Sequence, residues 1–373
     1  MRTIAFYLPQ FHTIPENDEW WGKGFTEWVN VKNAKALFEG HEQPRIPLNK
    51  NYYDLSNVEI MRKQTEMARK YGIDGFCFYH YWFDGHLLLE RPVENYLKAV
   101  NIDFPFCICW PNESWTNAWV SGQNKVLIGQ NYGNRENWKQ HFNYLLPFFK
   151  DKRYIFKDGK PIFMVYRPEL IDCRKEMFEY WQELAKKEGF KGLTYMFQRP
   201  DALINNPNLD LSMFDYCVEY QPYTAFLLDS RKKHATLKKI KNNFATFLEK
   251  KIGISAASIN RKRKGPIIYD YDEIWEDVLN EAPLTSHSIP CAFINWDNTP
   301  RRKENGSLFQ GMTPEKFKNY FIKLINKTKT VYNEDMIFIF AWNEWAEGGY
   351  LEPDEKFGYQ YLEAVRDALE STK

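Results

Sequence analysis

Met336-Ile337-Phe338-Ile339-Phe340-Ala341 is an unbroken apolar run, and the polar and aromatic stretch Trp342-Asn343-Glu344-Trp345-Ala346-Glu347-Gly348 follows it directly. An apolar run of this length, without alternation, is typical of a strand buried on both faces of a parallel sheet. The two glutamates should therefore emerge where the strand ends. In a barrel of parallel strands this end carries the active site.

Similar short apolar runs alternate with helical patterns along the whole chain, which is the signature of repeated βα units. The strands are predicted at Thr3–Pro9, Asp74–Trp82, Pro105–Pro111, Pro161–Pro168, Leu193–Pro200, Asp215–Pro222, Pro290–Asp297 and Met336–Trp342. The helices are predicted at Asn57–Tyr71, Pro92–Val100, Arg135–Phe149, Cys173–Glu188, Thr313–Thr328 and Tyr359–Ser371. Eight such strands favour a single (β/α)₈ TIM-barrel domain over residues 1–373. The alternative is a doubly wound nucleotide-sugar fold.

Two segments exceed a minimal barrel. Residues 11–53, rich in Trp, Pro, Asn and charge, form a long first βα loop expected to cover the site. Residues 223–288 form an insertion after the sixth strand, and its part 231–264 holds twelve lysines and arginines but one acidic residue. Such a charge excess could contact an anionic glycan or a membrane surface. The simpler interpretation is a solvated helical excursion.

The composition is that of a soluble globular protein. The formal net charge is +1 with 27% charged residues, so nothing in the total indicates a nucleic-acid partner. Aromatic residues make up 17%, which suggests that many line a groove. The sequence enters a strand at once without an apolar leader, and a cytoplasmic location is expected.

Glu344 and Glu347 are the predicted catalytic residues. Glycosidic bond cleavage needs one carboxylic acid to protonate the leaving oxygen and a second carboxylate to act at the sugar. If the turn is helical, a spacing of three residues places both groups on one face. The alternative is a solvated helix start with acids favoured by the helix dipole, but interleaved Trp and Asn are a poor surface composition.

The ends of the other strands, together with the first loop, carry polar and aromatic residues that suit sugars, whose edges are hydroxyls and whose faces are C–H groups. The predicted substrate-binding residues are Tyr7, Gln10, Glu27, Trp28, Tyr79, His80, Trp82, Trp110, Asn112, Glu113, Trp115, Glu219, Tyr220, Trp296, Asp297, Arg301, Asn343, Trp345 and Tyr350. Their position at strand ends predicts one shared pocket.

No motif indicates a cofactor or a metal. The sequence has no Gly-rich phosphate loop, no GxSxG elbow and no HExxH spacing. Asp270-Tyr271-Asp272 has the Asp-x-Asp pattern of metal-dependent nucleotide-sugar transferases. Apolar residues follow it at helical spacing, so an acidic helix start is the simpler interpretation.

Six blocks resemble the WbsX family of bacterial polysaccharide and O-antigen gene clusters, whose members are labelled glycosyltransferases. They are Phe6–His12, Trp20–Trp28, Gly75–Tyr79, Cys109–Trp115, Trp296–Arg302 and Trp342–Asp354. That family is in turn similar to the endo-α-mannosidases of glycoside hydrolase family ninety-nine through the Asn-Glu-Trp-x-Glu-Gly element. This resemblance implies that Glu344 is a base that deprotonates the sugar 2-hydroxyl and that Glu347 is the acid/base. The chain departs at Ala346, where the mannosidases typically carry His.

The residues and the resemblance lead to three hypotheses of function. The first is a retaining glycoside hydrolase acting on a bacterial polysaccharide or related glycan. The second is a glycosyltransferase of O-antigen, lipopolysaccharide or capsule biosynthesis. The third is a glycan-binding protein that retains the barrel without catalysis.

Overall fold

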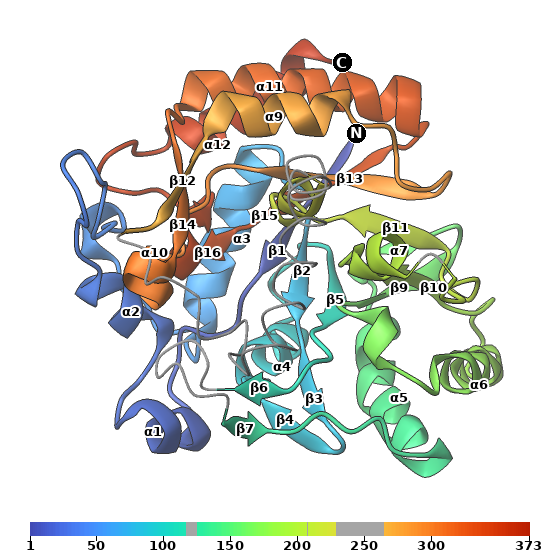
Figure 1. Ribbon diagram of the computed structural model, residues 1–373. Coiled ribbons are helices and arrows are strands. Elements are labelled where there is room, and N and C mark those ends of the chain that lie inside the picture. The colour runs from blue at the N-terminus through green and yellow to red at the C-terminus, as the bar shows by residue number, and fades with distance from the viewer. Residues whose placement is uncertain (117–124, 207, 229–264) are drawn as a thin grey trace, which may run out of the picture.

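The computed structural model describes residues 1–116, 125–206, 208–228 and 265–373, and Figure 1 shows its eight parallel strands in one sheet. In chain order they are β1 (Arg2–Tyr7), β2 (Gly75–Tyr79), β5 (Phe106–Trp110), β9 (Lys160–Val165), β10 (Thr194–Phe197), β11 (Tyr216–Glu219), β13 (Ser288–Phe293) and β15 (Met336–Phe340). The pairing of β1 with β15 and of β9 with β10 closes the sheet, so the fold is the predicted (β/α)₈ barrel. The doubly wound alternative is wrong.

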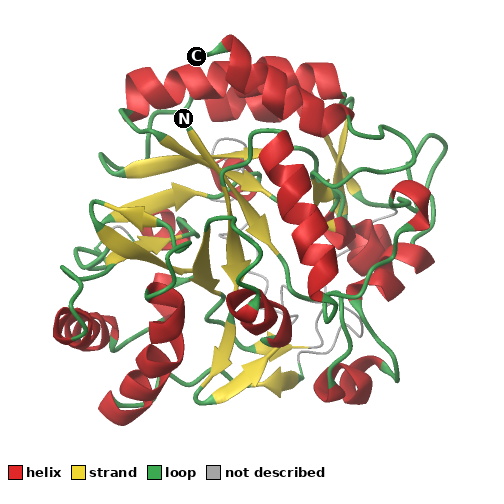
Figure 2. Ribbon diagram, turned by 180° about the vertical axis from the view of Figure 1, so that it is seen from behind, coloured by secondary structure: helices red, strands yellow, loops and turns green. Residues whose placement is uncertain are grey.

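Helices cover the outside of the barrel, as the two opposite views show (Figures 1 and 2). The long ones are α3 (Val58–Lys70), α4 (Arg91–Lys98), α5 (Arg135–Phe149), α6 (Arg174–Lys187), α9 (Tyr271–Asn280), α11 (Pro314–Lys327) and α12 (Gln360–Ser371). In α11 the side chain of Thr313 accepts from the N–H of Lys316 and Pro314 occupies the first turn. Its buried residues Phe317, Phe321, Leu324 and Ile325 recur at helical spacing, so one face packs inward.

Short strands and helices lie in the loops that connect the main elements of the barrel. The remaining strands are β3 (Tyr81–Phe83), β4 (His86–Leu88), β6 (Trp115–Thr116), β7 (Val126–Ile128), β8 (Phe156–Lys157), β12 (Ile267–Asp270), β14 (Ser307–Gln310), β16 (Asn343–Glu344) and β17 (Gly349–Tyr350). The short α-helices are α1 (Pro15–Trp21), α2 (Glu27–Asn33), α7 (Asp201–Asn205) and α10 (Thr299–Arg302). The first loop therefore contains α1 and α2.

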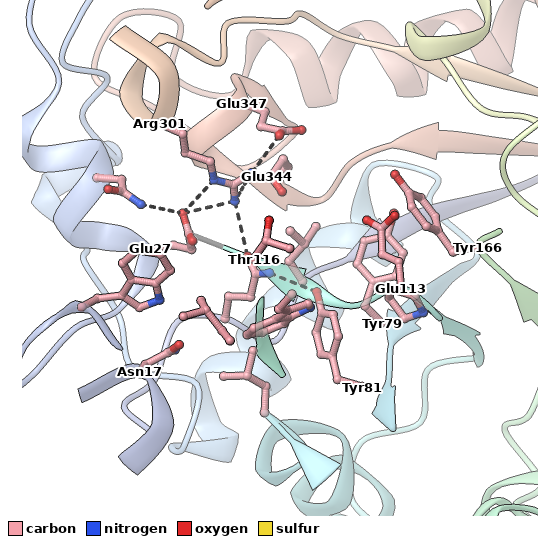
Figure 3. Close-up of a pocket in the computed structure, with 18 of the residues that line it drawn as sticks. Asn17, Glu27, Tyr79, Tyr81, Glu113, Thr116, Tyr166, Arg301, Glu344 and Glu347 are labelled. Atoms are coloured by element: carbon pink, nitrogen blue, oxygen red, sulfur yellow. Dashed lines mark hydrogen bonds and ion pairs between the residues drawn. The ribbon is translucent and has the colours of Figure 1, made fainter. Parts of the chain in front are cut away.

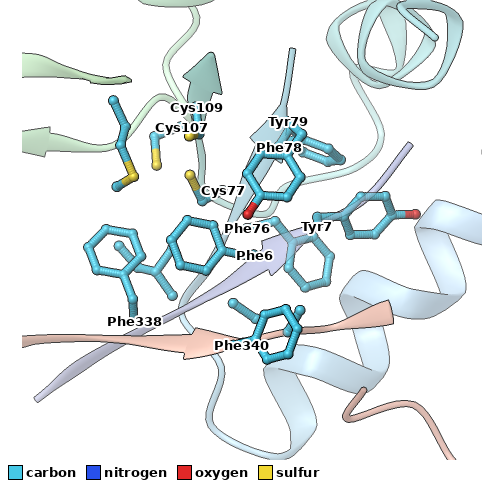
Figure 4. Close-up of a cluster of buried hydrophobic side chains, with 14 of the residues drawn as sticks. Phe6, Tyr7, Phe76, Cys77, Phe78, Tyr79, Cys107, Cys109, Phe338 and Phe340 are labelled. Carbon is cyan, nitrogen blue, oxygen red and sulfur yellow. The ribbon is translucent and has the colours of Figure 1, made fainter. Parts of the chain in front are cut away.

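The strands sort their side chains by alternation into a barrel interior and an outer layer (Figure 4). Phe6 stacks on Tyr79 and Phe338 inside the barrel. Its neighbour Tyr7 points to the helix layer, where its hydroxyl donates to Gln64 of α3 at 2.6 Å. This alternation decides which strand-end residues can reach a pocket in the barrel mouth.

The insertion after β11 is described in part. Its basic segment 231–264 lies within residues 229–264, outside the described residues. Beyond it, Asp270 accepts from the N–H groups of Asp272 and Glu273 as the N-cap of α9, and Asp272 pairs with Lys316 at 2.5 Å. The Asp-x-Asp pattern is therefore the predicted acidic helix start. Among the residues that the structure describes, no helix has the length and apolar composition needed to cross a membrane.

Candidate active site

A cavity of about 440 Å³ lies at the carboxyl ends of the barrel strands, beneath the first loop (Figure 3). The first loop, the strand ends and the β6 and β7 strands all contribute to its wall. The lining residues are Leu8, Gln10, Asn17, Trp21, Phe25, Glu27, Asn30, Tyr79, Tyr81, Leu89, Pro111, Glu113, Ser114, Trp115, Thr116, Leu127, Tyr166, Tyr220, Arg301, Arg302, Glu344 and Glu347. Aromatic rings beside carboxylates and amides form a wall that suits a sugar.

Glu344 and Glu347 belong to a tight turn between β16 and β17, in which Trp345–Glu347 form one 3₁₀ turn. Gly348 closes the turn with φ +69°, and a Cβ there would lie 3.0 Å from the backbone nitrogen of Asp297. That nitrogen donates to the carbonyl of Glu347 at 2.7 Å. Only glycine fits this backbone and this close approach, which together fix where the two carboxylates point.

Arg301, from α10, joins both glutamates (Figure 3). Its Nη1 lies 2.8 Å from Glu347 Oε1 and its Nη2 lies 3.2 Å from Glu344 Oε1. A third carboxylate, Glu27 of α2, receives Nη2 at 3.1 Å and Nε at 3.2 Å. The side chains of Arg301, Glu27 and Glu347 are each 14% exposed and that of Glu344 is 6% exposed, so the cluster is largely shielded from solvent.

Burial and the neighbouring charges of this cluster change the pKa of Glu344. Burial raises the pKa of the Glu344 carboxyl well above its ordinary value. The positive charge of Arg301 opposes the shift, and the negative charges of Glu347 and Glu27 add to it. A proton is therefore retained near Glu344 at a higher pH than at an ordinary glutamate.

Asp297 connects three segments behind the pocket. Its carboxylate accepts from His41 at 3.0 Å, Gln43 at 2.7 Å and the Thr299 hydroxyl at 2.6 Å. Burial acts to raise the pKa of Asp297, but these donors and the charge of Arg45 outweigh it and lower the pKa. The carboxylate thus stays ionised and ties the first loop to the turn that carries Arg301.

Glu352 is a second buried carboxylate, near the turn that carries Glu344 and Glu347. It accepts from the Trp345 indole, the Tyr53 hydroxyl and the Gln64 amide, each at 2.7 Å. Burial raises the pKa of Glu352 to about 7, although these donors lower it. Through Trp345, which lies between the two catalytic candidates in sequence, Glu352 anchors the turn from behind.

The structure brings nine of the predicted site residues into the pocket lining. They are Gln10, Glu27, Tyr79, Glu113, Trp115, Tyr220, Arg301, Glu344 and Glu347. They come from the first loop and from the ends of six strands, β1, β2, β5, β11, β13 and β15. These nine residues therefore line one cavity, as the sequence analysis expected.

The other predicted residues lie outside the lining, and most of them face the helix layer or the support of the turn. They are Tyr7, Trp28, His80, Trp82, Trp110, Asn112, Glu219, Trp296, Asp297, Asn343, Trp345 and Tyr350. His80 Nε2 meets His141 Nε2 at 2.9 Å, and Trp82 stacks on the same imidazole at 4.5 Å. Glu219 accepts from the Tyr332 hydroxyl at 2.6 Å.

Several of these residues hold backbone or rings in place. The side chain of Asn112 bridges to the N–H and carbonyl of Arg167, and that of Asn343 does the same for Leu8. The remaining members make ring contacts or indole hydrogen bonds: Trp110 with His141, Trp28 with Trp345, Trp345 with Tyr350, and Trp296 with Ser307. They support the pocket from behind.

The lining also contains residues that the sequence analysis did not select. Tyr81 is two residues beyond Tyr79, and the period-two alternation of a strand would have placed both on the pocket side. Tyr166 follows β9 in the same way. Asn17, Trp21, Phe25 and Asn30 come from the first loop, where no regular period predicts direction.

The fold and the site define a (β/α)₈ barrel with a buried acidic cluster at the end of its last strand. The chain matches the family described as Glycosyltransferase WbsX over residues 3–365 and belongs to it. It is 34% identical over 373 residues to the protein named WxcX of Xanthomonas campestris pv. campestris. The aligned region covers 98% of this chain and 49% of WxcX. The chain thus spans about half the length of the curated relatives it matches.

Solved structures share the fold. The GH99 endo-alpha-mannosidase from Bacteroides thetaiotaomicron superposes with a TM-score of 0.58 and 15% identity, covering 100% of this chain and 97% of that one. A glycoside hydrolase-like protein superposes with a TM-score of 0.57 and 13% identity, covering 98% and 93%. At these identities the likeness concerns the barrel fold.

Proposed function

We propose that this chain is a carbohydrate-active enzyme, specifically a retaining glycoside hydrolase that cleaves glycosidic bonds in a bacterial polysaccharide or related glycan. The observation that carries the proposal is that Arg301 forms ion pairs with both Glu344 and Glu347 in the pocket lining. A pair of carboxyl groups on one pocket wall is what acid-assisted cleavage requires. The whole barrel, residues 1–373, is proposed as the catalytic domain.

In the proposed reaction Glu344 takes the proton of the sugar 2-hydroxyl as that oxygen attacks C1. The bond from C1 to the leaving oxygen breaks, and Glu347 gives its proton to that oxygen. Water then attacks C1 of the anhydro sugar; Glu347 takes the proton of the water and Glu344 returns its proton to the 2-oxygen. Two displacements at C1 retain the anomeric configuration.

Five further lining residues are proposed to bind the glycan. Tyr79, Tyr220 and Trp115 offer ring faces and hydroxyls, and Gln10 and Glu113 offer hydrogen-bonding groups. Such groups recognise neutral sugar hydroxyls without a cofactor. The basic segment 231–264 is proposed as a peripheral contact for an anionic glycan or membrane surface.

The family description favours one competitor, a glycosyltransferase. The two enzymes differ in their donor, because a transferase of this kind binds a nucleotide sugar. Calorimetry with a panel of nucleotide sugars separates them: metal-dependent, tight binding would favour transfer. The hydrolase proposal expects no such binding.

A screen of bacterial polysaccharides for newly released reducing ends tests the proposal. The expected result is product from the wild-type chain and at least a thousandfold less, roughly, from Glu347→Gln. An activated aryl glycoside of the same sugar, whose leaving group needs no proton, should recover much of that loss. Retention of glycans on an array without cleavage in the screen would instead indicate a binding protein.

A further inference from the structure

Glu27 meets the catalytic candidates only through Arg301. Its Oε2 accepts from both Nη2 at 3.1 Å and Nε at 3.2 Å of the guanidinium, which also pairs with Glu344 and Glu347 and donates to Gln10 Oε1 at 3.5 Å (Figure 3). We propose that Glu27 is a positioning residue of the hydrolytic site, which acts on the glutamate pair through Arg301 and does not bind the sugar. This inference rests on the proposed function.

The backbone that carries Glu27 is fixed to the catalytic turn. The next residue, Trp28, packs against Trp345 with ring centroids 5.6 Å apart and against Phe11 at 4.4 Å. The Trp28 indole also donates to the carbonyl of Tyr53 at 2.8 Å. Helix α2 is therefore locked against the segment that bears Glu344 and Glu347, and Glu27 has little freedom to move independently of them.

The guanidinium is a planar fork with five N–H donors, so two contacts on one edge set the direction of the rest. Glu27 takes the Nε and Nη2 edge, and this leaves Nη1 aimed at Glu347 and Nη2 shared with Glu344. A neutral residue at position 27 would weaken that edge. Arg301 would then pair more fully with the two catalytic candidates and hold them away from the substrate.

The charge of Glu27 has a second consequence, for the protonation of Glu344. The titratable and charged groups that face Glu344 are Arg301, Glu347, Glu27, Tyr81 and Tyr220. The negative charge of Glu27 raises the pKa of Glu344. Glu344 must be ionised to act as base, so removal of that charge should extend activity to lower pH.

The test compares pH profiles of kcat/KM for the wild type, Glu27→Gln, Glu27→Asp and Glu19→Gln on the glycan found by hydrolysis screening. Glu27→Gln preserves shape and removes charge, while Glu27→Asp preserves charge and shortens reach. Glu19 is an exposed carboxylate of the same loop outside the pocket lining and serves as the matched control.

For Glu27→Gln we expect kcat to fall about tenfold or more, KM to stay within about twofold, and the acidic limb to move to lower pH. In Glu27→Asp, kcat should fall but the acidic limb of the pH profile should stay at the wild-type pH. In Glu19→Gln, both kcat and the acidic limb should match the wild type. A raised KM with unchanged kcat and unchanged limb in Glu27→Gln would overturn the proposal, because it would mean that Glu27 binds the sugar.

A readout without substrate separates this inference from the proposed function. If the wild type hydrolyses no glycan in the screen, the proposed function fails on its own. Glu344 can still be titrated in the full chain by carboxyl ¹³C NMR, with its signal assigned by its loss in Glu344→Gln. A titration that moves to lower pH in Glu27→Gln and not in Glu19→Gln supports the coupling, and an unmoved titration overturns it.

Discussion

Glu344 and Glu352 lie at the same end of the barrel, eight positions apart, and are almost equally hidden, at 4% and 8% exposure. Burial raises the pKa of both carboxyls. Their partners differ. Glu344 shares a cation with two other carboxylates at the pocket floor, whereas Glu352 is enclosed by the neutral donors Trp345, Tyr53 and Gln64.

The comparison shows that two carboxyls buried to a similar depth can have quite different partners. A neutral cage satisfies the oxygens of Glu352 completely and leaves none for a substrate. A shared guanidinium holds Glu344 by one oxygen at 3.2 Å and keeps it at the cavity wall. The variants below test whether this difference in partners is a difference in role.

The largest expected effect is on turnover. Glu344→Gln should lower kcat/KM on the glycan substrate by about a thousandfold or more, because the amide cannot take the proton of the sugar hydroxyl. Glu352→Gln should lower it by about tenfold at most, because Glu352 acts only through Trp345. Steady-state kinetics with circular dichroism of both variants measures this, and equal losses would erase the distinction.

The next effect is on stability and belongs to Glu352. Its folded pKa of about 7 lies above the roughly 4.3 of a free glutamate, so between these values the folded chain binds a proton that the unfolded chain has released. The free energy of unfolding therefore falls as pH rises from about 4 to about 8, through the folded pKa. At about 1.4 kcal/mol per pKa unit, the total loss from this one group is on the order of 3–4 kcal/mol.

The difference in unfolding free energy between the wild type and Glu352→Gln isolates that contribution. In chemical denaturation at a series of pH values, the free energy of unfolding of the wild type should decrease relative to that of the variant across this pH window. Above the window the difference should not change further. The same subtraction with Glu19→Gln, at an exposed site outside the pocket lining, serves as the control. A pH-independent difference for Glu352→Gln would mean that Glu352 titrates as an ordinary glutamate.

The smallest effect concerns one donor of the neutral cage. Tyr53→Phe removes the hydroxyl that donates to Glu352 at 2.7 Å. At pH 5.5 the carboxyl is protonated, so the lost bond is between neutral groups and should cost about 1 kcal/mol of stability. Urea denaturation at that pH measures it, and a loss several times larger would indicate that Glu352 is ionised there.

The barrel itself was predictable because each of its eight buried strands is marked by an apolar run in the sequence, and each predicted run overlaps an observed strand. The pocket was predictable only in part. Adjacent strand-end residues face opposite sides, so Tyr79 reaches the cavity while His80 turns to His141 in the helix layer. Applying the same alternation beyond the strand would have selected Tyr81 in place of His80 and Trp82.

The acidic cluster could not be predicted as a cluster. Arg301 contacts Glu347, 46 positions away, and Glu27, 274 positions away, and the contact with Glu27 depends on how the first loop folds over the barrel. Irregular segments lack the periodicity that assigns a direction to each side chain. Glu27 and Trp28 illustrate this, because one faces the cavity and the other faces the core.

The backbone link from Asp297 to Glu347 has a consequence for redesign of substrate range. The first loop, the Asp297–Arg302 segment and the turn that bears Glu344 and Glu347 are tied together by that link and by the Arg301 cluster, so these three would have to be exchanged as one unit in a chimera. Thr116 and Leu127 line the same cavity from the β6 and β7 strands, outside these three segments. Libraries confined to these positions can vary what the pocket accepts while the carboxylates stay in place.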